Sequence, residues 1–543
     1  AAVGLDSVST FECIIDKDRH YFMEMNTRVQ VEHRVSELCY SLRFTNPDDD
    51  NDSFSVDSIV ELMVLLARHG NRLPCPTREP RESASLEARM NATDSALKPH
   101  AGGVITHWSD TIAGEIRDDQ GICLHNPDTD VFMKYHLAGA YDSNIALLLS
   151  TGSDRTESYR RMAEILRQTR LTGESLRTNT EFLYGLINWL IGNNVNARPA
   201  TNFVVPYLTA VGKLKSISNN LDINYAYDKI RNYHLDTSVD PAYKNAVQDI
   251  IGRKTTLLTR AINQLFAEPH YMSGWLAMNR HRYEVTKNGT EWLDNPIRVL
   301  ADLYHYLNMD AREGLPALYA IWDHDKEILT DALKFYDSIE AKLGVKNWPE
   351  LKKSLKSKKG GGTLGKEQLP ALAAHTGFQL GMEILSILPY IGQHSGFLDL
   401  KVNEDLSIYL PDNLRDRDAQ EAAFKNLSPP PAISSDRITA PTGGMFYSRE
   451  APDQPPFINP GQHFEAGEPL FIIEVMKMFN KVYAPFSGTI NEILIETDAT
   501  IVKRGEAVFM VTPDEEIFVE SKEEVQSKIR QETDRFLAEN GYG

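Results

Sequence analysis

The sequence has few cysteines, no long apolar run and fewer basic than acidic residues. Its cysteines, Cys13, Cys39, Cys75 and Cys123, are widely spaced and form no CxxC or Cys/His pattern. This spacing argues against a disulfide scaffold and a structural zinc site, and it predicts a reducing, cytoplasmic compartment. No stretch approaches the roughly 18 apolar residues that cross a bilayer, so no membrane span is predicted.

The balance of charge argues against nucleic acid as a partner. The 543 residues include 57 Lys and Arg against 76 Asp and Glu, a formal net charge of -19. Binding to a phosphate backbone needs a basic surface, which this composition does not supply. An anionic substrate would therefore have to meet local arginine and lysine side chains. With 42% hydrophobic and 24% charged residues, the composition is that of a globular protein of several domains.

Hydrophobic periodicity predicts the main elements. The chain begins at Ala1 without an initiating methionine or a signal-peptide pattern, from which we expect a fragment. Two strands, 11–15 and 21–33, are predicted around a polar turn at 16–20. Helices are predicted at 57–68, 155–169, 179–192, 241–267, from Asn295-Pro296 onward, at 323–344, and after the capping box Ser521–Glu524. Strands are also expected near 396–410, and the proline run at 429–435 is typical of a linker.

The last part of the chain contains an internal repeat. Ala440-Pro-Thr-Gly-Gly-Met445 recurs as Ala484-Pro-Phe-Ser-Gly-Thr489, and Gly467-Glu-Pro-Leu-Phe-Ile472 recurs as Gly505-Glu-Ala-Val-Phe-Met510. Two copies of one strand–turn–strand unit predict a flattened barrel with pseudo-twofold symmetry. The tripeptide Met476-Lys477-Met478 falls at the junction of the halves, where a hairpin turn is needed. The lysine is therefore expected at a hairpin tip in solvent.

This repeat resembles the biotinyl domain of biotin carboxyl carrier proteins over residues 436–513. The resemblance implies that Lys477 is biotinylated. It also implies a recognition pattern for biotin protein ligase that consists of Glu474, Met476 and Met478. The related lipoyl domains usually place Asp and Ala beside their lysine, so this tripeptide favours biotin. The insertion at 448–457 resembles the thumb of bacterial acetyl-CoA carboxylase carriers; apart from that resemblance, it is a proline-rich surface loop.

A second pattern lies at residues 23–33, Met-Glu-Met-Asn-Thr-Arg-Val-Gln-Val-Glu-His. If the segment is one strand, its side chains alternate between two faces. The polar face then holds Glu24, Asn26, Arg28, Gln30 and Glu32. Such a row could hold a metal, an anion and a proton acceptor together, although spacing alone favours a solvated, salt-bridged edge strand.

The same segment resembles the EMNxRxQVEH signature at the end of the ATP-grasp core of biotin carboxylases. Glu12 and Glu24, with Asn26 beside them, match the residues that hold the Mg²⁺ or Mn²⁺ ions bridging the phosphates of ATP. Glu32 matches the general base that deprotonates bicarbonate. The rest of the bicarbonate pocket is matched by Arg28, Gln30 and Val31.

Residues 85–94, Ser-Leu-Glu-Ala-Arg-Met-Asn-Ala-Thr-Asp, resemble the ECRINAED stretch of the same enzymes. Arg89 matches the arginine that stabilises the enolate of biotin, a role suited to a fixed guanidinium opposite developing oxyanion charge. Outside that resemblance, Arg89 is more typical of a structural ion pair. The resemblance continues through Tyr141-Asp142 and covers residues 1–212. Arg34 replaces the usual proline, and because the ATP-binding half is missing, the fragment is not expected to bind ATP unaided.

The predicted fold class is multidomain α+β. It combines the C-terminal part of an ATP-grasp biotin carboxylase, a mostly helical middle domain and an all-β flattened-barrel biotinyl domain. The predicted boundaries are 1–84 for the end of the ATP-grasp core, 85–215 for the carboxylase C-terminal domain, 216–428 for a docking or scaffold domain with a few strands, 429–435 for a linker, 436–513 for the biotinyl domain and 514–543 for a C-terminal helix.

The resemblance implies ATP- and bicarbonate-dependent carboxylation of biotin on Lys477 and delivery of the carboxyl group to a carboxyltransferase subunit or domain. The implied acceptor is an acyl-CoA. Acetyl-CoA, which gives malonyl-CoA for fatty acid biosynthesis, is the first choice because of the thumb-like insertion; propionyl-CoA or a longer acyl-CoA is the alternative. Biotin protein ligase and a homo-oligomeric assembly are the other expected partners. The competing interpretation is a non-enzymatic biotin carrier or scaffold.

Overall fold

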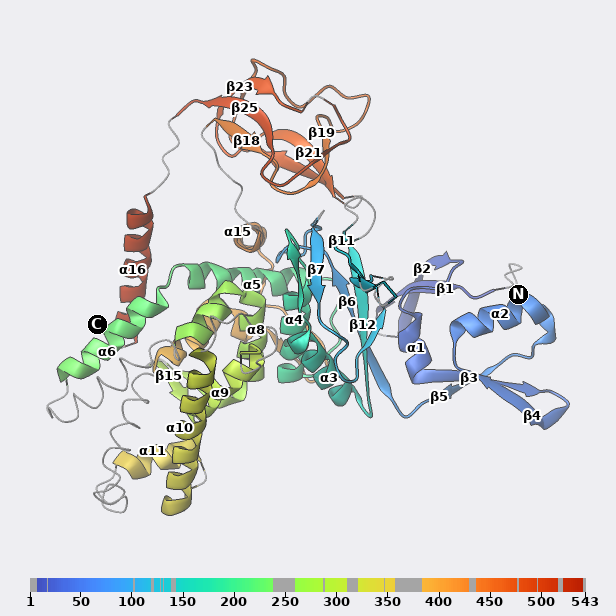
Figure 1. Cartoon of the computed structure of the whole chain (residues 1–543), viewed down its shortest axis with the longest axis horizontal. Helices are drawn as coiled ribbons and strands as arrows, with labels where there is room; N and C mark the ends of the chain where they lie inside the picture. The colour runs from blue at the N-terminus through green and yellow to red at the C-terminus, as the bar shows by residue number, and fades with distance from the viewer. Residues whose placement is uncertain are drawn as a thin grey trace. The chain divides into compact units, whose positions relative to one another are not determined.

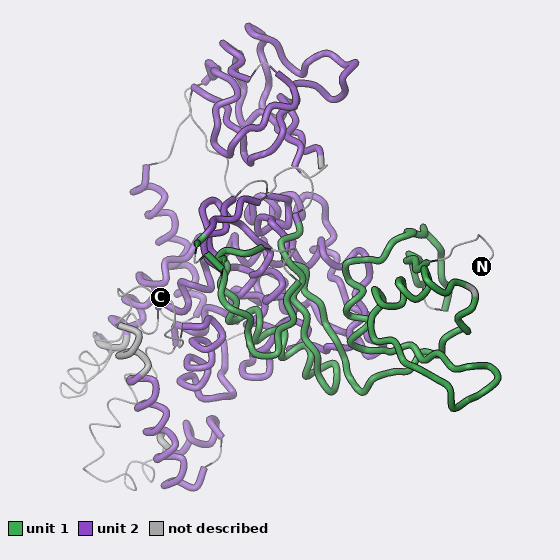
Figure 2. Tube along the Cα trace, turned by 45° about the vertical axis from the view of Figure 1, so that its right-hand side comes forward, with its two compact units in different colours: residues 1–90, 108–132, 144–171 green, residues 91–107, 133–143, 172–543 purple. Residues whose placement is uncertain are grey.

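The structure is a computed structural model that describes residues 7–16, 18–100, 103–118, 122–126, 128–129, 131–137, 143–237, 259–286, 289–309, 321–345, 347–356, 383–428, 436–475, 478–495, 497–515 and 521–540 (Figure 1). The chain forms two compact units, each assembled from segments distant in sequence (Figure 2). Unit 1 holds residues 1–90, 108–132 and 144–171, and unit 2 holds the remainder. Within the described ranges, no helix combines the length and apolar character that a bilayer crossing requires.

Unit 1 begins with an antiparallel hairpin of β1 (Thr10–Asp16) and β2 (Arg19–Asn26). The prediction of one strand over 21–33 is wrong beyond Asn26. Asn26 pairs with Thr10, the first residue of β1, so no partner residue remains to extend the ladder. The chain turns instead, and α1 (His33–Cys39) begins with Glu32 at its N-cap. The side chains of Arg28, Gln30 and Glu32 therefore project from a loop and a helix start.

The rest of the N-terminal region combines a three-stranded sheet, which was not predicted, with a helix that was. β3 (Tyr40–Asn46) lies between β4 (Asp49–Val56) and β5 (Thr77–Pro80). α2 (Ile59–His69) confirms the predicted helix, because the side chain of Ser58 accepts hydrogen bonds from two backbone N–H groups in its first turn. Gly70, with φ of 52°, ends it in a conformation that suits glycine.

A second sheet in unit 1 supports the candidate site. Its strand order is β6 (Ala84–Asn91), β12 (Asn144–Gly152) and β8 (Ile116–Asp118). β12 is almost entirely buried because the sequence NIALLLSTG supplies a continuous apolar run. α3 (Arg155–Gln168), capped by Asp154, buries Met162, Ile165 and Leu166 and packs against β12. The helix predicted at 155–169 is thus confirmed.

Unit 2 contains a small sheet of β11 (Tyr135–His136), β7 (Val104–Trp108) and β13 (Leu171–Glu174) and a group of packed helices. α4 (Thr180–Asn193), predicted at 179–192, packs against α8 (Pro269–Met278). A Cβ on Gly185 would lie only 2.2 Å from the backbone oxygen of His270, so this close helix crossing requires glycine. α5 (Val204–Asn219) packs against α15 (Arg417–Leu427) in the same unit.

The middle of the chain is mostly helical, as predicted. α9 (Pro296–Tyr306) starts after Asn295, whose side chain accepts a hydrogen bond from Ile297 N. α10 (Ile321–Leu343) matches the helix predicted at 323–344. The helix predicted at 241–267 lies largely outside the described residues. The described residues of this region also form α6 (Ile223–Thr237), α11 (Trp348–Lys356) and α14 (Ile387–His394).

Two short hairpins interrupt these helices. The first, β14 (Tyr283–Thr286) with β15 (Gly289–Trp292), was not predicted from the sequence. The second, β16 (Lys401–Val402) with β17 (Ile408–Tyr409), confirms strands within 396–410. That prediction is wrong for Phe397–Asp399, which form a 3₁₀ turn. Gly396 starts this turn with φ of 75°, a left-handed conformation that interrupts extended backbone.

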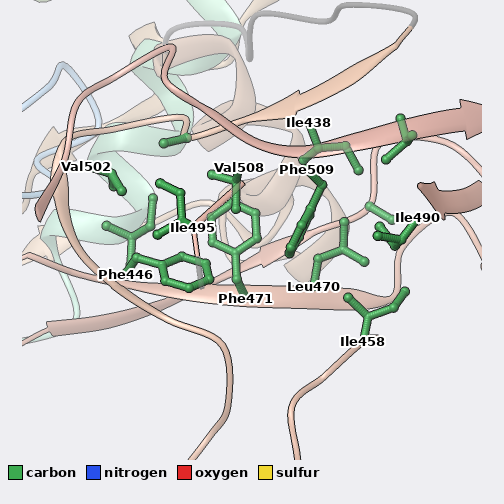
Figure 3. Close-up of a cluster of buried hydrophobic side chains, with 14 of the residues drawn as sticks. Ile438, Phe446, Ile458, Leu470, Phe471, Ile490, Ile495, Val502, Val508 and Phe509 are labelled. Carbon is green, nitrogen blue, oxygen red and sulfur yellow. The ribbon is translucent and has the colours of Figure 1, made fainter. Parts of the chain in front are cut away.

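The C-terminal domain is a sandwich of two four-stranded antiparallel sheets. One has the order β18 (Arg437–Thr439), β25 (Ala507–Pro513), β23 (Gly488–Ile493), β20 (His463–Phe464). The other has the order β22 (Met478–Tyr483), β21 (Pro469–Val475), β19 (Gly444–Tyr447), β24 (Thr500–Val502). Between them lies an apolar core that includes Phe446, Phe471, Ile490, Val508 and Phe509 (Figure 3). The linker predicted at 429–435 lies outside the described residues.

The chain ends in α16 (Lys522–Glu539). Its N-terminus has the predicted capping box, because Glu524 N donates to Ser521 Oγ and Ser521 N donates to the Glu524 carboxylate. Phe536 and Leu537 are buried near the end of the helix. The helix therefore has an apolar contact surface in its last turns.

Candidate active site

Two carboxylates face each other across the β1–β2 hairpin. Glu12 pairs directly with Glu24 in the ladder, and this register places two like charges side by side. The Nδ2 of Asn26 donates to Glu12 Oε1 over 2.8 Å and to Glu24 Oε1 over 3.0 Å. One amide thus bridges both carboxylates. The three residues that the signature assigns to the metal lie together.

The loop after β2 returns further polar side chains to the same carboxylates. Gln30 Nε2 donates to Glu12 Oε1 over 3.2 Å, and Arg28 Nη1 donates to Gln30 Oε1 over 2.6 Å. Thr10 Oγ1 donates to the backbone oxygen of Arg28 over 3.3 Å, which ties the loop to β1. Val31 exposes 41% of its surface. The residues expected on one strand face are therefore gathered by a turn.

Glu32 and Arg89 meet although they are far apart in sequence. Arg89 lies on β6, and its Nη1 donates to Glu32 Oε1 over 3.3 Å. Their side chains are 40% and 45% exposed, so a substrate could reach the pair. Glu32 also begins α1, where its backbone oxygen accepts a hydrogen bond from Val35 N. The expected base and the expected oxyanion-stabilising arginine therefore share one location in unit 1.

Sequence reasoning missed Glu87. It precedes Arg89 by two residues on β6, and the alternation of a strand places both side chains on one face. Burial raises the pKa of Glu87 to about 7, and the nearby carboxylates of Glu32 and Asp118 add to the effect, against the lowering by Arg89. Its Oε2 is buried and has no hydrogen-bond partner among the residues that the structure describes. The sequence could have indicated Glu87, because its carboxylate stands two residues before Arg89, the arginine selected from the sequence.

The donor set at Glu12, Glu24 and Asn26 suits a hard divalent cation. Mg²⁺ prefers oxygen ligands, and it is usually held by one or two carboxylates together with phosphate and water. Because Asn26 uses its Nδ2 to bridge the carboxylates, its amide oxygen is the atom that would ligate. Among the described residues no group of three His, Cys, Asp or Glu side chains could hold a metal by itself. Two carboxylates and an amide oxygen would suit a Mg²⁺ that takes its remaining ligands from phosphate and water.

The C-terminal domain presents the expected modification region. In the register of β21 with β22, Val475 lies opposite Met478, so the strands converge on the segment between them. Met476 and Lys477 lie outside the described residues, as does the side chain of Met478. Glu474 precedes this segment, and its Oε2 accepts a hydrogen bond from the Tyr447 hydroxyl over 2.6 Å.

The insertion at 448–457 is held against this domain by several contacts. Phe457 N donates to the backbone oxygen of Ser448 over 2.9 Å and closes the loop. Lys481 Nζ lies 2.9 Å from Glu450 Oε1 and 5.9 Å from the centre of the Phe457 ring. Arg449 pairs with Asp498 over 3.0 Å. The insertion is therefore tied to β22, the strand that follows Lys477.

Comparisons with known proteins find relatives for two parts of the chain. Residues 436–511 match the family described as biotin-requiring enzyme, and residues 1–42 match the ATP-binding domain of the carbamoyl-phosphate synthase L chain. The biotin carboxylase of Pseudomonas aeruginosa is 28% identical over 186 residues, which are 34% of this chain and 35% of that protein. The alpha subunit of mitochondrial methylcrotonoyl-CoA carboxylase from Rattus norvegicus is 31% identical over 195 residues, 34% of this chain and 23% of that protein.

One solved structure illustrates the limits of the structural similarity. The biotin carboxylase domain of the 2-oxoglutarate carboxylase from Hydrogenobacter thermophilus is 23% identical, with a TM-score of 0.24 over 33% of this chain and 35% of that chain. The chain spans about a third of the length of the biotin carboxylases it matches.

These matches define the class of protein. The chain joins part of an ATP-grasp biotin carboxylase to a C-terminal biotinyl domain, and its fold class is multidomain α+β. This is the domain make-up of a biotin-dependent carboxylase. The predicted resemblance of the N-terminal part to biotin carboxylases and of residues 436–511 to biotinyl domains is thereby confirmed.

Proposed function

We propose that this chain belongs to the component of a biotin-dependent carboxylase that carboxylates biotin with ATP and bicarbonate and carries it on Lys477. The observation that supports this most directly is the Glu32–Arg89 pair beside the polar side chains gathered around Glu12. A solvated edge strand, the alternative from spacing alone, does not require Arg89 to reach Glu32 from another sheet. The biotin-requiring family match at 436–511 supports the carrier role.

Each residue of the site has a definite task in this proposal. When bound, Mg²⁺ and ATP supply the phosphoryl group that activates bicarbonate, and biotin supplies the nitrogen that accepts the carboxyl group. Glu12, Glu24 and Asn26 would hold the metal. Glu32 removes the proton from bicarbonate, which Arg28 and Gln30 orient. Arg89 stabilises negative charge that develops on the biotin oxygen, because a fixed guanidinium acts strongly on a developing oxyanion.

For the acceptor we propose acetyl-CoA. The insertion at 448–457 supports this choice through its likeness to the thumb of acetyl-CoA carboxylase carriers. The similarity of the chain to methylcrotonoyl-CoA carboxylase alpha subunits favours a longer acyl-CoA as the alternative. Propionyl-CoA is a further alternative acceptor. We further propose a carboxyltransferase and biotin protein ligase as partners, a homo-oligomeric assembly and the domain boundaries predicted above.

The carrier role is tested by Lys477→Ala. We expect intact mass to lose the increment of one biotin and streptavidin blots to become negative. Lys481→Ala is the matched control, because Lys481 lies on β22 only four residues away and pairs with Glu450. Label that persists in Lys477→Ala would refute Lys477 as the attachment site.

The enzymatic role is tested by Glu32→Gln in the complete protein. Bicarbonate-dependent ATP hydrolysis with free biotin as acceptor should fall by about 10²-fold or more, because the amide cannot accept the proton. Glu61→Gln is a control on the exposed first turn of α2. A protein that is biotinylated but shows no such hydrolysis would instead be a carrier or scaffold, the competing function.

A further inference from the structure

The C-terminal helix α16 docks on α6, although the biotinyl domain separates them in sequence. Thr533, Phe536 and Leu537 of α16 are buried, whereas Val525 in its first half exposes 40% of its surface. The ring of Phe536 lies 4.7 Å from the ring of Tyr390 in an edge-on arrangement. The apolar part of α16 is therefore its last two turns, and these turns are covered.

One residue at the start of α6 holds α16 at two points. Asp222 N donates to Thr533 Oγ1 over 3.0 Å, and Asp222 Oδ2 accepts from Gln526 Nε2 over 2.7 Å. Asp222 Oδ1 accepts from Tyr225 N over 3.0 Å. The group that caps α6 thus binds α16 as well, so the position of α16 is specified along its length.

Three further polar contacts surround the buried turns. The Tyr225 hydroxyl donates to Asp534 Oδ1 over 3.0 Å, and Lys229 Nζ lies 3.6 Å from the same oxygen. At the end of the helix, the Tyr390 hydroxyl donates to Glu539 Oε2 over 2.6 Å. Each exposed pair of this kind contributes little to stability. Together they fix the orientation of α16 on the residues that its apolar turns contact.

The two ends of the biotinyl domain leave it side by side. Val511 N donates to the backbone oxygen of Asp436 over 2.9 Å, and Arg437 pairs with Met510 in the ladder of β18 with β25. The preceding helix, α15, buries Ala423 and Leu427 and packs on α5. The domain is therefore flanked by a docked helix on each side of the sequence.

We propose that α16 is a second anchor of the biotinyl domain, which confines the travel of Lys477 between α15 and α6. Covalent geometry sets the limit, because seven residues (429–435) span at most about 25 Å and five residues (516–520) at most about 18 Å. A domain held at one end explores a larger volume than one held at both ends. Two anchors therefore raise the effective concentration of the biotinyl domain near its attachment points.

The anchor itself does not depend on the proposed function, whereas its consequence for biotin delivery does. When α16 is undocked, the biotinyl domain is attached to the rest of the chain only through α15. The domain can then move farther from that attachment point. A carboxylase component could use such a release to pass biotin to a more distant active site. The docked state would keep the carrier close to its own chain.

The test uses the full chain with Phe536→Glu, which places a carboxylate in the buried contact. Amide hydrogen exchange of α16 should accelerate on the order of tenfold or more, since a docked helix becomes a free one. Methyl NMR signals of the biotinyl domain should narrow because the domain tumbles more freely. Val525→Glu is the control: it introduces the same carboxylate on the same helix at an exposed position and should alter neither measurement. Thr533→Val, which removes only the hydroxyl that accepts from Asp222, should give a smaller change in the same direction.

Two results would overturn the proposal. One is exchange in wild-type α16 as fast as in Phe536→Glu. The other is a biotinyl domain whose signals do not narrow when α16 is released. Repeating the comparison in a Lys477→Ala background separates this inference from the proposed function, because the lack of biotin leaves the anchor intact.

Discussion

The Nη1 of Arg89 lies 3.3 Å from Oε1 of Glu32 and joins β6 to the residue that begins α1. The two residues belong to two separate motifs of the sequence, and no local pattern links them. Their contact brings a candidate base and a candidate oxyanion-stabilising cation within reach of one substrate. It also shows that unit 1 keeps these groups together within a single compact part of the chain.

Arg89→Lys should lower biotin-dependent turnover of the complete enzyme by about 10²-fold while the chain stays folded. The planar guanidinium can hold Glu32 and a developing oxyanion at once, whereas an ammonium is a point charge with different geometry. Both side chains of the pair are substantially exposed, so its loss costs about 1 kcal/mol of stability at most. Arg161→Lys, which changes an exposed helical partner of Glu157, is the control. Equal turnover in the two variants would contradict the assignment of Arg89.

Glu87→Gln should remove a pH-dependent loss of stability. The pKa of Glu87 is raised to about 7, mainly by burial, from an ordinary value near 4.5. Between these values the folded chain binds more protons than the unfolded chain, so stability falls as pH rises and levels off above about 7. The effect is on the order of 1 kcal/mol once solvent screening at a half-buried group is allowed for.

Urea unfolding at pH 5, 6, 7 and 8 measures this effect of Glu87. Above pH 7 the Gln variant should be more stable than wild type, and the advantage should vanish near pH 4.5. Burial also raises the pKa of Glu181 to about 7, so only the difference between variant and wild type reports on Glu87. Glu82→Gln, at an exposed position before β6, should behave as wild type. A pH-independent difference for Glu87→Gln would contradict the prediction.

Asn26→Ala should weaken the binding of Mg²⁺ together with nucleotide in the complete enzyme by about 10- to 100-fold. The substitution removes both hydrogen bonds to Glu12 and Glu24 and leaves two facing carboxylates to repel each other. Mn²⁺ can replace Mg²⁺ as a paramagnetic probe, so metal binding is measured independently of turnover. Asn51→Ala, on the exposed strand β4, is the control. If both variants bind the probe as wild type does, Asn26 neither ligates the metal nor positions Glu12 and Glu24 for it.

Much of the fold was predictable because local rules decide it. α2 ends just before Gly70, the predicted stop, and it begins after Ser58, two residues later than the predicted start at 57. The end of β2 was not predictable from alternation, because it depends on where β1 begins and therefore on a partner strand. The 23–33 pattern consequently predicted these side chains on one strand face, whereas the structure gathers them around a turn.

The candidate site was only partly predictable for a related reason. Family resemblance selected Glu32 and Arg89, but the contact between them is a tertiary property of β6 and α1. Glu87 was missed because its raised pKa arises from burial and from the charge of Glu32, neither of which is visible in a strand pattern. The sequence did place the Glu87 carboxylate two residues before Arg89, and this spacing puts both side chains on one face of β6.

The glycines of the internal repeat give a final prediction. A Cβ on Gly444 would lie 2.5 Å from Ile473 Cγ2 and 2.6 Å from the backbone oxygen of Glu474, and one on Gly488 would lie 2.7 Å from the backbone oxygen of Thr512. Both equivalent positions therefore require glycine for close strand packing. Gly444→Ala and Gly488→Ala should each destabilise the biotinyl domain by about 1–3 kcal/mol or more.

Thermal unfolding of the full chain, followed through methyl signals of the biotinyl core, measures this loss in both glycine variants. If the proposed biotin protein ligase acts on the folded domain, biotinylation of Lys477 should fall in proportion to the folded fraction. Glu492→Ala, at an exposed position on β23, should leave both unchanged. If only one of the two glycine variants unfolds at a lower temperature than wild type, the two halves of the repeat are not structurally equivalent. The repeat would then be a similarity of sequence without matching structural roles.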